Sequence, residues 1–188
     1  SVTRNQEYYQ IAIELLERDL KNTRLDTETN ILQTIDERDR LLPYLSGGTI
    51  GIGVAIWFLN HVSGENLFHK ELRSISNLND IRCSFSGGLF DGIGGFLLLP
   101  IIHNDSVETY EKNINDAIEK LNLFILRKED EFLYSGNFCY RLSHDLYSGS
   151  SGIILALNAI IKSNPLSWIP IVNVDSFIVK TSPKKVVI

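Results

Sequence analysis

The side chains most able to transfer protons lie in the stretch SHDLYSG, residues 143–149, which leads into an apolar run. An imidazole titrates near neutral pH, so His144 can accept or release a proton under ordinary conditions. Asp145 beside it could orient the imidazole, although adjacent residues seldom face each other. The stretch has a second reading, in which a strand end leads into a helix cap and His144 bonds to backbone. Both readings place these side chains at the start of a helix.

Asp91 directly precedes another glycine, Gly92, and is a candidate catalytic carboxylate. It can equally be a capping carboxylate, since acidic and hydroxyl side chains accept hydrogen bonds from the first N–H groups of a helix. The first N–H groups are otherwise unpaired and carry a partial positive charge, so a helix start can hold a polar substrate group. The candidate substrate-binding positions are Ser46, Gly48, Gly92, Ser148 and Gly149, of which the serines can also be caps.

Pairs of glycines with one spacing position all these residues. The pairs are Gly48-x-x-Gly51, Gly92-x-x-Gly95 and Gly149-x-x-Gly152, and an apolar stretch follows each of them. Gly92 lies 44 residues after Gly48, and Gly149 lies 57 after Gly92. A repeat of about 45 residues with two helices is typical of a helical solenoid or toroid. Glycine would let the inner helices approach closely, and we expect their first N–H groups to point into a shared cavity.

Hydrophobic periodicity gives the remaining elements. Residues 5–20 have the apolar spacing of an amphipathic surface helix, and the polar segment 28–40 can accommodate a short helix. Amphipathic helices are expected between the glycine turns, over 65–78 and 106–128. The stretch EFLYSGNFCYRLS, residues 131–143, is predicted to form a small hairpin with its turn at Ser135–Gly136. The chain then divides into a first segment (1–43), a repeat region (44–173) and a tail (174–188).

Composition excludes several classes of protein. The 188 residues carry a net charge of -5, which argues against a nucleic-acid-binding face. There is no apolar run long enough for a membrane span and no secretory signal, so we expect a cytoplasmic domain without a membrane partner. Two cysteines are too few for a disulfide scaffold. The sequence contains no methionine, from which we expect a processed or excised piece of a longer chain.

The stretches LPYLSGGTIGIG, SGGLFDGIGGFLLL and YRLSHDLYSGSSGIILAL, followed by LSWIPIV, resemble the LanC-like lanthionine cyclases. Over residues 40–173 the order is similar to the last half of the C-terminal cyclase domain of class III lanthipeptide synthetases. The resemblance implies an all-α fold, in which this chain forms part of an α/α toroid with a small β-hairpin insertion.

The resemblance also implies a reaction. A cysteine thiol of a precursor peptide adds to dehydroalanine or dehydrobutyrine in a Michael-type step, forming lanthionine or labionin. His144, Asp145, Tyr147 and Asp91 are then the candidates for catalysis, with Tyr147 donating a proton to the enolate. The implied partners are the precursor peptide and the kinase and lyase domains of the same synthetase. ATP or another nucleoside triphosphate with magnesium would belong to the kinase domain and not to this segment.

The zinc ligands of related cyclases are missing from the three turns. Zinc takes about four ligands, mostly Cys and His, and the residues before the paired glycines include neither. Cys83 and Cys139 stand at the wrong places in their repeats, so we expect no zinc. Loss of the ligands leaves open a non-catalytic scaffold that binds the precursor or supports the kinase and lyase. A carbohydrate-active toroid and an unrelated peptide-binding solenoid are weaker alternatives.

Overall fold

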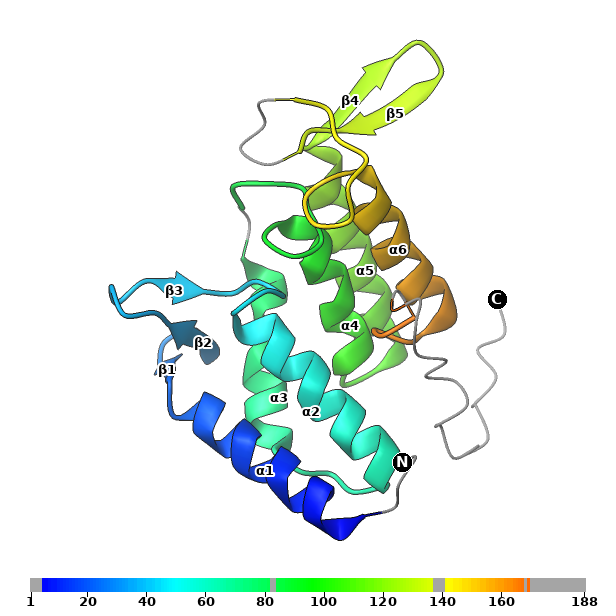
Figure 1. Ribbon diagram of the computed structural model, residues 1–188. Coiled ribbons are helices and arrows are strands. Elements are labelled where there is room, and N and C mark those ends of the chain that lie inside the picture. Colours follow the sequence, from blue (N-terminus) through cyan, green and yellow to red (C-terminus); the bar gives the residue numbers. More distant parts are fainter. Residues whose placement is uncertain (1–4, 82–83, 137–140, 168, 170–188) are drawn as a thin grey trace.

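Six α-helices, two 3-10 helices and two small antiparallel sheets make up the part of the chain that the computed structural model describes, residues 5–81, 84–136, 141–167 and 169 (Figure 1). The prediction of an all-α toroid is therefore wrong, because five strands accompany the helices. Within the described residues, no helix combines the length and apolar content needed to cross a membrane.

The first helix, α1 (Gln6–Leu20), confirms the predicted amphipathic helix. It begins after Asn5, whose side-chain oxygen accepts a hydrogen bond from the Glu7 amide at 2.9 Å. A side-chain acceptor at this position pairs one of the donors that a helix start leaves open. Leu16 is buried, whereas Leu15 and Tyr8 on the same helix remain exposed.

The segment after α1 forms a sheet and not the short helix expected over 28–40. Strands β1 (Thr23–Asp26), β2 (Ile31–Ile35) and β3 (Leu41–Leu42) pair antiparallel in the order β1-β2-β3. The turn between the first two is closed by Asp26, whose carboxylate accepts from the Glu28 amide and the Thr29 hydroxyl. Asn30 adopts a left-handed backbone with a φ of 54°, which a helix cannot include. The polar residues of this segment give no hydrophobic pattern from which the turn could be predicted.

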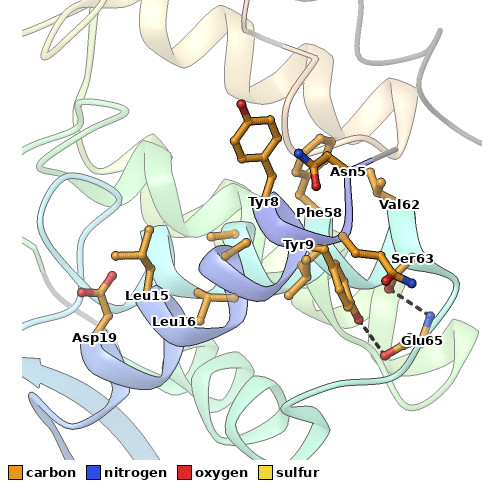
Figure 2. Close-up of a pocket in the computed structure, with 14 residues that line it drawn as sticks. Asn5, Tyr8, Tyr9, Leu15, Leu16, Asp19, Phe58, Val62, Ser63 and Glu65 are labelled. Carbon is orange, nitrogen blue, oxygen red and sulfur yellow. Dashed lines mark hydrogen bonds between the residues drawn. The ribbon is translucent and has the colours of Figure 1, made fainter. Parts of the chain in front are cut away.

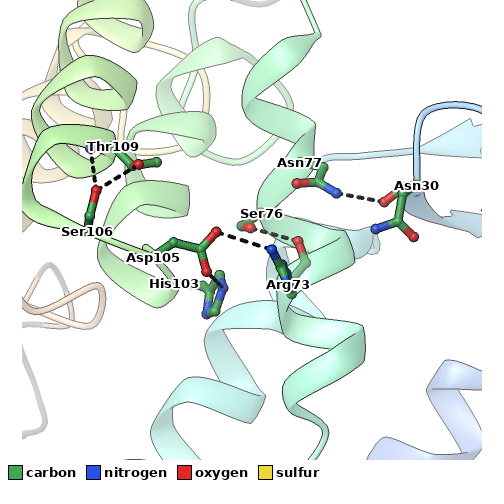
Figure 3. Close-up of polar contacts among 8 residues, drawn as sticks. All are labelled: Asn30, Arg73, Ser76, Asn77, His103, Asp105, Ser106 and Thr109. Atoms are coloured by element: carbon green, nitrogen blue, oxygen red, sulfur yellow. Dashed lines mark hydrogen bonds and ion pairs between the residues drawn. The ribbon is translucent and has the colours of Figure 1, made fainter.

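Helix α2 (Thr49–Ser63) packs between α1 and α3 (His69–Ser76), and a 3-10 turn, η1 (Asn77–Asp80), extends α3. Ile50 and Ile56 on α2 are fully buried. Figure 3 shows how polar contacts tie α3 to its neighbours on two sides. The Asn77 side chain donates to the Asn30 carbonyl at 2.9 Å, and Arg73 forms an ion pair with Asp105 at 3.6 Å.

The central apolar run forms the middle of the core. It consists of a 3-10 helix, η2 (Ile93–Leu98), followed by the short helix α4 (Leu99–Ile102), and nearly all of its side chains are buried. Pro100 has no N–H to donate to a residue one turn earlier, which accounts for the break between the two pieces. Helix α5 (Val107–Asn122) begins directly after Ser106, whose hydroxyl accepts a hydrogen bond from the Thr109 amide at 3.1 Å.

The predicted amphipathic helix over 106–128 is too long, because its last residues form a strand. Strand β4 (Ile125–Lys128) pairs with β5 (Glu131–Tyr134), so the hairpin turn lies at 129–130 and not at Ser135–Gly136. Ser135 instead forms a single bridge with Leu142. Helix α6 (Ser150–Lys162) follows. In Figure 1 the β4–β5 hairpin projects beyond the helices.

The described chain contains an internal repeat of about one hundred residues. A helix, a hairpin, a glycine turn and a second helix occur in this order twice, first from α1 to α2 and then from α5 to α6. The corresponding elements begin between 100 and 102 residues apart. The middle glycine turn follows α3 and η1 in place of a hairpin. The division of the chain at residues 43 and 173 stays a prediction.

Candidate functional site

The three glycine turns lie side by side and are joined through equivalent residues. The Ser46 amide donates to the Phe90 carbonyl at 2.8 Å, and the Phe90 amide donates to the Tyr147 carbonyl at 3.2 Å. Each of these residues stands two positions before the first glycine of its pair. The sequence repeat is therefore a repeat in space, and the residues ahead of each helix are brought to one edge of the molecule.

Both glycines of each pair are required by the turn that precedes the helix. A β-carbon on Gly48 would lie 2.6 Å from the Leu42 carbonyl oxygen, and one on Gly51 would lie 2.5 Å from the Leu45 carbonyl oxygen. Both carbonyls come from the residue six positions earlier. The same overlap recurs at the other two pairs, at Gly92, Gly95, Gly149 and Gly152. Real β-carbons do not approach carbonyl oxygens so closely, so the folded-back turn excludes every larger residue.

The same fold-back changes the electrostatics expected of the helix starts. The Ile50 amide donates to the Pro43 carbonyl at 3.1 Å, the Ile93 amide to Ser86 at 2.9 Å, and the Ser150 amide to Ser143 at 3.0 Å. For these three N–H groups, the expectation that they point unpaired into a cavity is wrong, because the preceding turn supplies their acceptors. Their capacity to attract an anion is correspondingly reduced, since that capacity depends on unpaired donors.

Side chains complete the joints between turns. Leu45 of the first turn places its β-carbon 3.4 Å from the β position of Gly95, and Leu89 of the second stands 2.9 Å from that of Gly152. The rings of Phe90 and Tyr147 are stacked, with centroids 5.2 Å apart and planes at 3°. The second glycines of the middle and third pairs thus each receive a leucine from the turn before them.

Asp91 belongs to a small polar cluster in the second turn. The Ser86 hydroxyl lies 3.3 Å from one Asp91 carboxylate oxygen and accepts the Gly88 amide at 3.0 Å. A β-carbon on Gly88 would lie 2.9 Å from the same carboxylate oxygen and 2.7 Å from the Cα of Ser148. Asp91 is therefore brought to the joint with the third turn, directly beside the buried Ser148.

Asp145 stabilises the third turn. Its carboxylate accepts a short hydrogen bond from the Ser143 hydroxyl and a bond from the Ser148 amide at 2.7 Å. These bonds, the Ser143 hydroxyl first and the Ser148 amide next, lower the pKa of the Asp145 carboxyl from 3.8 to about 2. Hydrogen bonds to the charged form have this effect even on an exposed carboxylate. Asp145 is consequently ionised at every physiological pH.

His144 and Tyr147 both lie on the exposed outer side of the third turn. The His144 carbonyl accepts from the Ser151 hydroxyl, whereas its imidazole has no hydrogen-bond partner among the described residues. The Asp145 carboxylate is held by Ser143 and Ser148 and does not orient the imidazole. The catalytic roles of His144 and Tyr147 stay predictions.

Ser46 is exposed at the first turn, and its neighbour Gly48 lines a pocket of about 260 Å³. Ser86, Gly88 and Ser143 are parts of the site that the sequence analysis missed. Their signal was present, because a serine stands six positions before the first glycine in both SGGLFDG and SHDLYSG. The second and third turns thus gather two carboxylates and the three hydroxyls of Ser86, Ser143 and Ser148, and the third turn also exposes the His144 imidazole.

The residues that could bind a metal ion are only partly covered by the structure. Cys83 and Cys139 lie outside the described residues. Within the described part of the chain, no group of three or more His, Cys, Asp and Glu side chains has the arrangement needed for a metal ion. Independence from zinc stays a prediction.

Comparison with known proteins gives one distant relative. No protein-family model matches the chain. The chain is 26% identical over 133 residues to a probable SapB synthase of Streptomyces coelicolor. The match covers 70% of this chain but only 14% of that protein, so the chain spans a small part of its relative's length.

Proposed function

We propose that this chain takes part in lanthipeptide biosynthesis, as the portion of a synthetase that closes thioether rings. The observation that carries the proposal is the set of three glycine turns, which resemble those of lanthionine cyclases and are joined through equivalent residues. The similarity to a probable synthase supports a biosynthetic role. The kinase and lyase that prepare the precursor peptide belong to other parts of such a synthetase.

In the proposed step, the cysteine thiol of the precursor peptide gives its proton to the His144 imidazole. The sulfur then bonds to the β-carbon of a dehydroalanine or dehydrobutyrine, and the π electrons of that residue move onto its carbonyl as an enolate. The Tyr147 hydroxyl donates a hydrogen bond to the enolate oxygen. Protonation of the α-carbon by the imidazolium gives lanthionine. Alternatively, the enolate carbon bonds to the β-carbon of a second dehydro residue, and the imidazolium then protonates the new enolate at its α-carbon, giving labionin.

The positions of the two side chains support these roles. His144 is exposed, and Tyr147 is 46% exposed while stacked on Phe90, so a peptide can reach both from solvent. In this step Asp91 and Asp145, on the second and third turns, act as acceptors for the backbone N–H groups of the bound precursor. Of the candidate substrate-binding positions, Ser46 is exposed, whereas Gly48, Gly92, Ser148 and Gly149 are buried and hold the turns in place beneath the exposed side chains. The step needs no zinc, because the imidazole removes the thiol proton.

A synthetic peptide with one cysteine and one dehydroalanine tests the proposal. We expect the chain to speed the loss of alkylatable thiol, and His144→Gln to slow it about 100-fold, the lower end of general acid–base effects. His69→Gln, which removes another exposed imidazole on α3, is the matched control and should leave the rate unchanged. A chelator should have no effect. A rate equal to that of the peptide alone, or one that depends on added zinc, contradicts the proposal.

A non-catalytic scaffold is the second candidate, and the paired N–H groups of the three helix starts favour it. Since the turns satisfy these donors themselves, they offer less to a developing thiolate. In this case the chain binds the precursor peptide without changing the rate of ring closure. Fluorescence anisotropy of a labelled peptide, measured beside the thiol assay, separates the two functions, and binding without acceleration selects the scaffold.

A further inference from the structure

The joint between neighbouring glycine turns has a direction. At each joint, the earlier turn contributes a leucine side chain and the backbone N–H group of the residue after that leucine. The later turn contributes the second glycine of its pair, which the leucine contacts, and the backbone carbonyl that accepts the hydrogen bond. Leu45 therefore packs at Gly95, and Leu89 packs at Gly152. A row of such joints ends with a leucine on one side and a glycine on the other.

The two ends of the row have complementary shapes. At the third turn, the equivalent leucine is Leu146, which is 40% exposed. At the first turn, the equivalent glycine is Gly51, which lines the pocket of about 260 Å³ between this turn and the end of α1. Within the chain, two glycines in this position, Gly95 and Gly152, are each contacted by a leucine of the preceding turn. The pocket at Gly51 is thus the counterpart of the Leu146 side chain.

The helices beside these turns continue the match. A groove of about 640 Å³ runs between α1 and α2, and Figure 2 shows its apolar walls. Its lining includes Leu15 and Tyr8 of α1 and Phe58 and Val62 of α2. Asp19 lines both the groove and the pocket at Gly51, so the two hollows adjoin. At the far end of the groove, Glu65 accepts a hydrogen bond from Tyr9 at 2.7 Å.

On the opposite edge, α6 presents an apolar stripe. Ile154 and Ile161 are 61% and 83% exposed, and their spacing of seven residues places them on one face of the helix. A helix placed with its start at the Gly51 pocket would run along the groove parallel to α2. Its two isoleucines would face the apolar walls, and Lys162 at its end would reach Glu65.

We propose that this chain associates head to tail with a second copy of itself. The third turn and α6 of one copy fill the Gly51 pocket and the α1–α2 groove of the next. The contact repeats between two chains the joint that already occurs twice inside each chain. Its two surfaces differ, which makes the association heterologous. This inference does not depend on the proposed enzymatic function.

Sedimentation velocity of the full chain over a hundredfold range of concentration tests the proposal, and we expect the mean mass to rise above that of one chain. Leu15→Asp places a charge in the apolar groove, and Ile154→Asp places one on the apolar face of α6. Each variant alone should therefore remain a monomer. An equimolar mixture should form a 1:1 dimer, because each variant keeps the surface that the other has lost. Ile11→Asp, on α1 but outside the groove lining, should associate like the unaltered chain.

Circular dichroism of each variant confirms that it is folded before its mass is interpreted. A single-chain mass at every concentration for the unaltered protein overturns the proposal and leaves the two edges to another occupant. Retained association of either single variant also overturns it, as does a mixture of the two that stays monomeric.

Discussion

Among single residues, Asp145 has the most strongly altered chemistry in the candidate site. Its carboxylate is bonded to the Ser143 hydroxyl and the Ser148 amide, and its pKa falls to about 2. The side chain is nevertheless exposed, so solvent screens part of the interaction. A carboxylate held in this way shapes the turn on which His144 and Tyr147 stand and does not transfer protons itself.

Stability should depend on the protonation of this residue at acidic pH. Because the pKa in the folded chain is lower than 3.8, the unfolded chain binds the proton first as the pH falls. The stabilisation by Asp145 is therefore complete above about pH 4 and is lost between about pH 4 and pH 2. We expect Asp145→Asn to have the lower urea midpoint at pH 7 and the two midpoints to converge over that range.

Asp130→Asn, at the tip of the β4–β5 hairpin, controls for the removal of one carboxylate. Hydrogen bonds also lower the pKa of the carboxyls of Asp26 and Asp36, but these titrate equally in both proteins and cancel in the difference. A constant difference between the midpoints from pH 7 to pH 2 would contradict the assigned role of Asp145.

At the scale of elements, the glycine turns set where the helices begin. Helices α2, η2 and α6 each start directly after the first glycine of a pair. The second glycine lies inside the helix, where glycine is normally unfavourable by about 1 kcal/mol relative to alanine. The carbonyl folded back against it explains why the position excludes a side chain.

Two glycines of α2 allow a matched test of this explanation. Gly51→Ala would press a methyl group against the Leu45 carbonyl oxygen, 2.5 Å away in the backbone, and should cost roughly 1–3 kcal/mol of unfolding free energy. Gly53→Ala meets the terminal methyl of Ile102 at 2.7 Å, which can shift, and the Ile75 γ2-methyl at 3.0 Å, and it gains helix propensity. We expect its unfolding free energy to stay within about 1 kcal/mol of the unaltered value. Urea unfolding measures both, and equal losses would contradict the explanation.

The elements that the sequence predicted well are those with regular hydrophobic spacing or glycine starts, namely α1, α2 and α6. Those it missed depend on less visible signals. The β1–β2 turn needs Asn30 in a left-handed conformation, and the β4–β5 turn needs the same of Glu129 at a φ of 55°. Asn adopts a left-handed conformation more readily than most residues, so it can indicate such a turn in a sequence, whereas Glu does not. The hairpin turn was therefore predicted at Ser135–Gly136, where the residue types favour a turn.

The candidate site was predictable only in part for a related reason. The glycine spacing identified Asp91, Asp145 and Ser148, because all three lie in the turns. The bonds that join the turns involve the backbone of Ser46, Phe90 and Tyr147. Backbone contacts between distant segments leave no side-chain pattern, so the order of the turns in space could not be read from the sequence.

For the whole molecule, the joined turns connect the two copies of the repeated unit, α1 to α2 and α5 to α6, through the middle turn. The N-terminal unit meets η2 through α2, and the C-terminal unit meets it through α5 and α6. The core residues Phe96 and Leu97 lie where the units meet. We therefore expect the described helices to unfold as one cooperative unit, and the turns to open only with them.

Amide hydrogen exchange tests this cooperativity. The amides of Ser46 and Phe90 lie in turns, and Ser46 is exposed, yet both donate to a carbonyl of the next turn. We expect both to exchange about as slowly as the buried amide of Ile56 in α2. The Glu28 amide, which donates to a side chain in the β1–β2 turn, should exchange far faster. Rapid exchange at Ser46 and Phe90 would show that the turns open independently.

The backbone bonds between the turns also bear on how the protein can change. Peptide groups form them whatever side chain the residue carries, and serine, phenylalanine and tyrosine already occupy the three equivalent places. Replacing the two exposed side chains, those of Ser46 and Tyr147, would alter what the outer surface presents without loosening the bonds beneath it. A protein engineer could therefore graft acidic, basic or aromatic groups there, side by side on an unchanged frame, to retune which molecules the surface recognises.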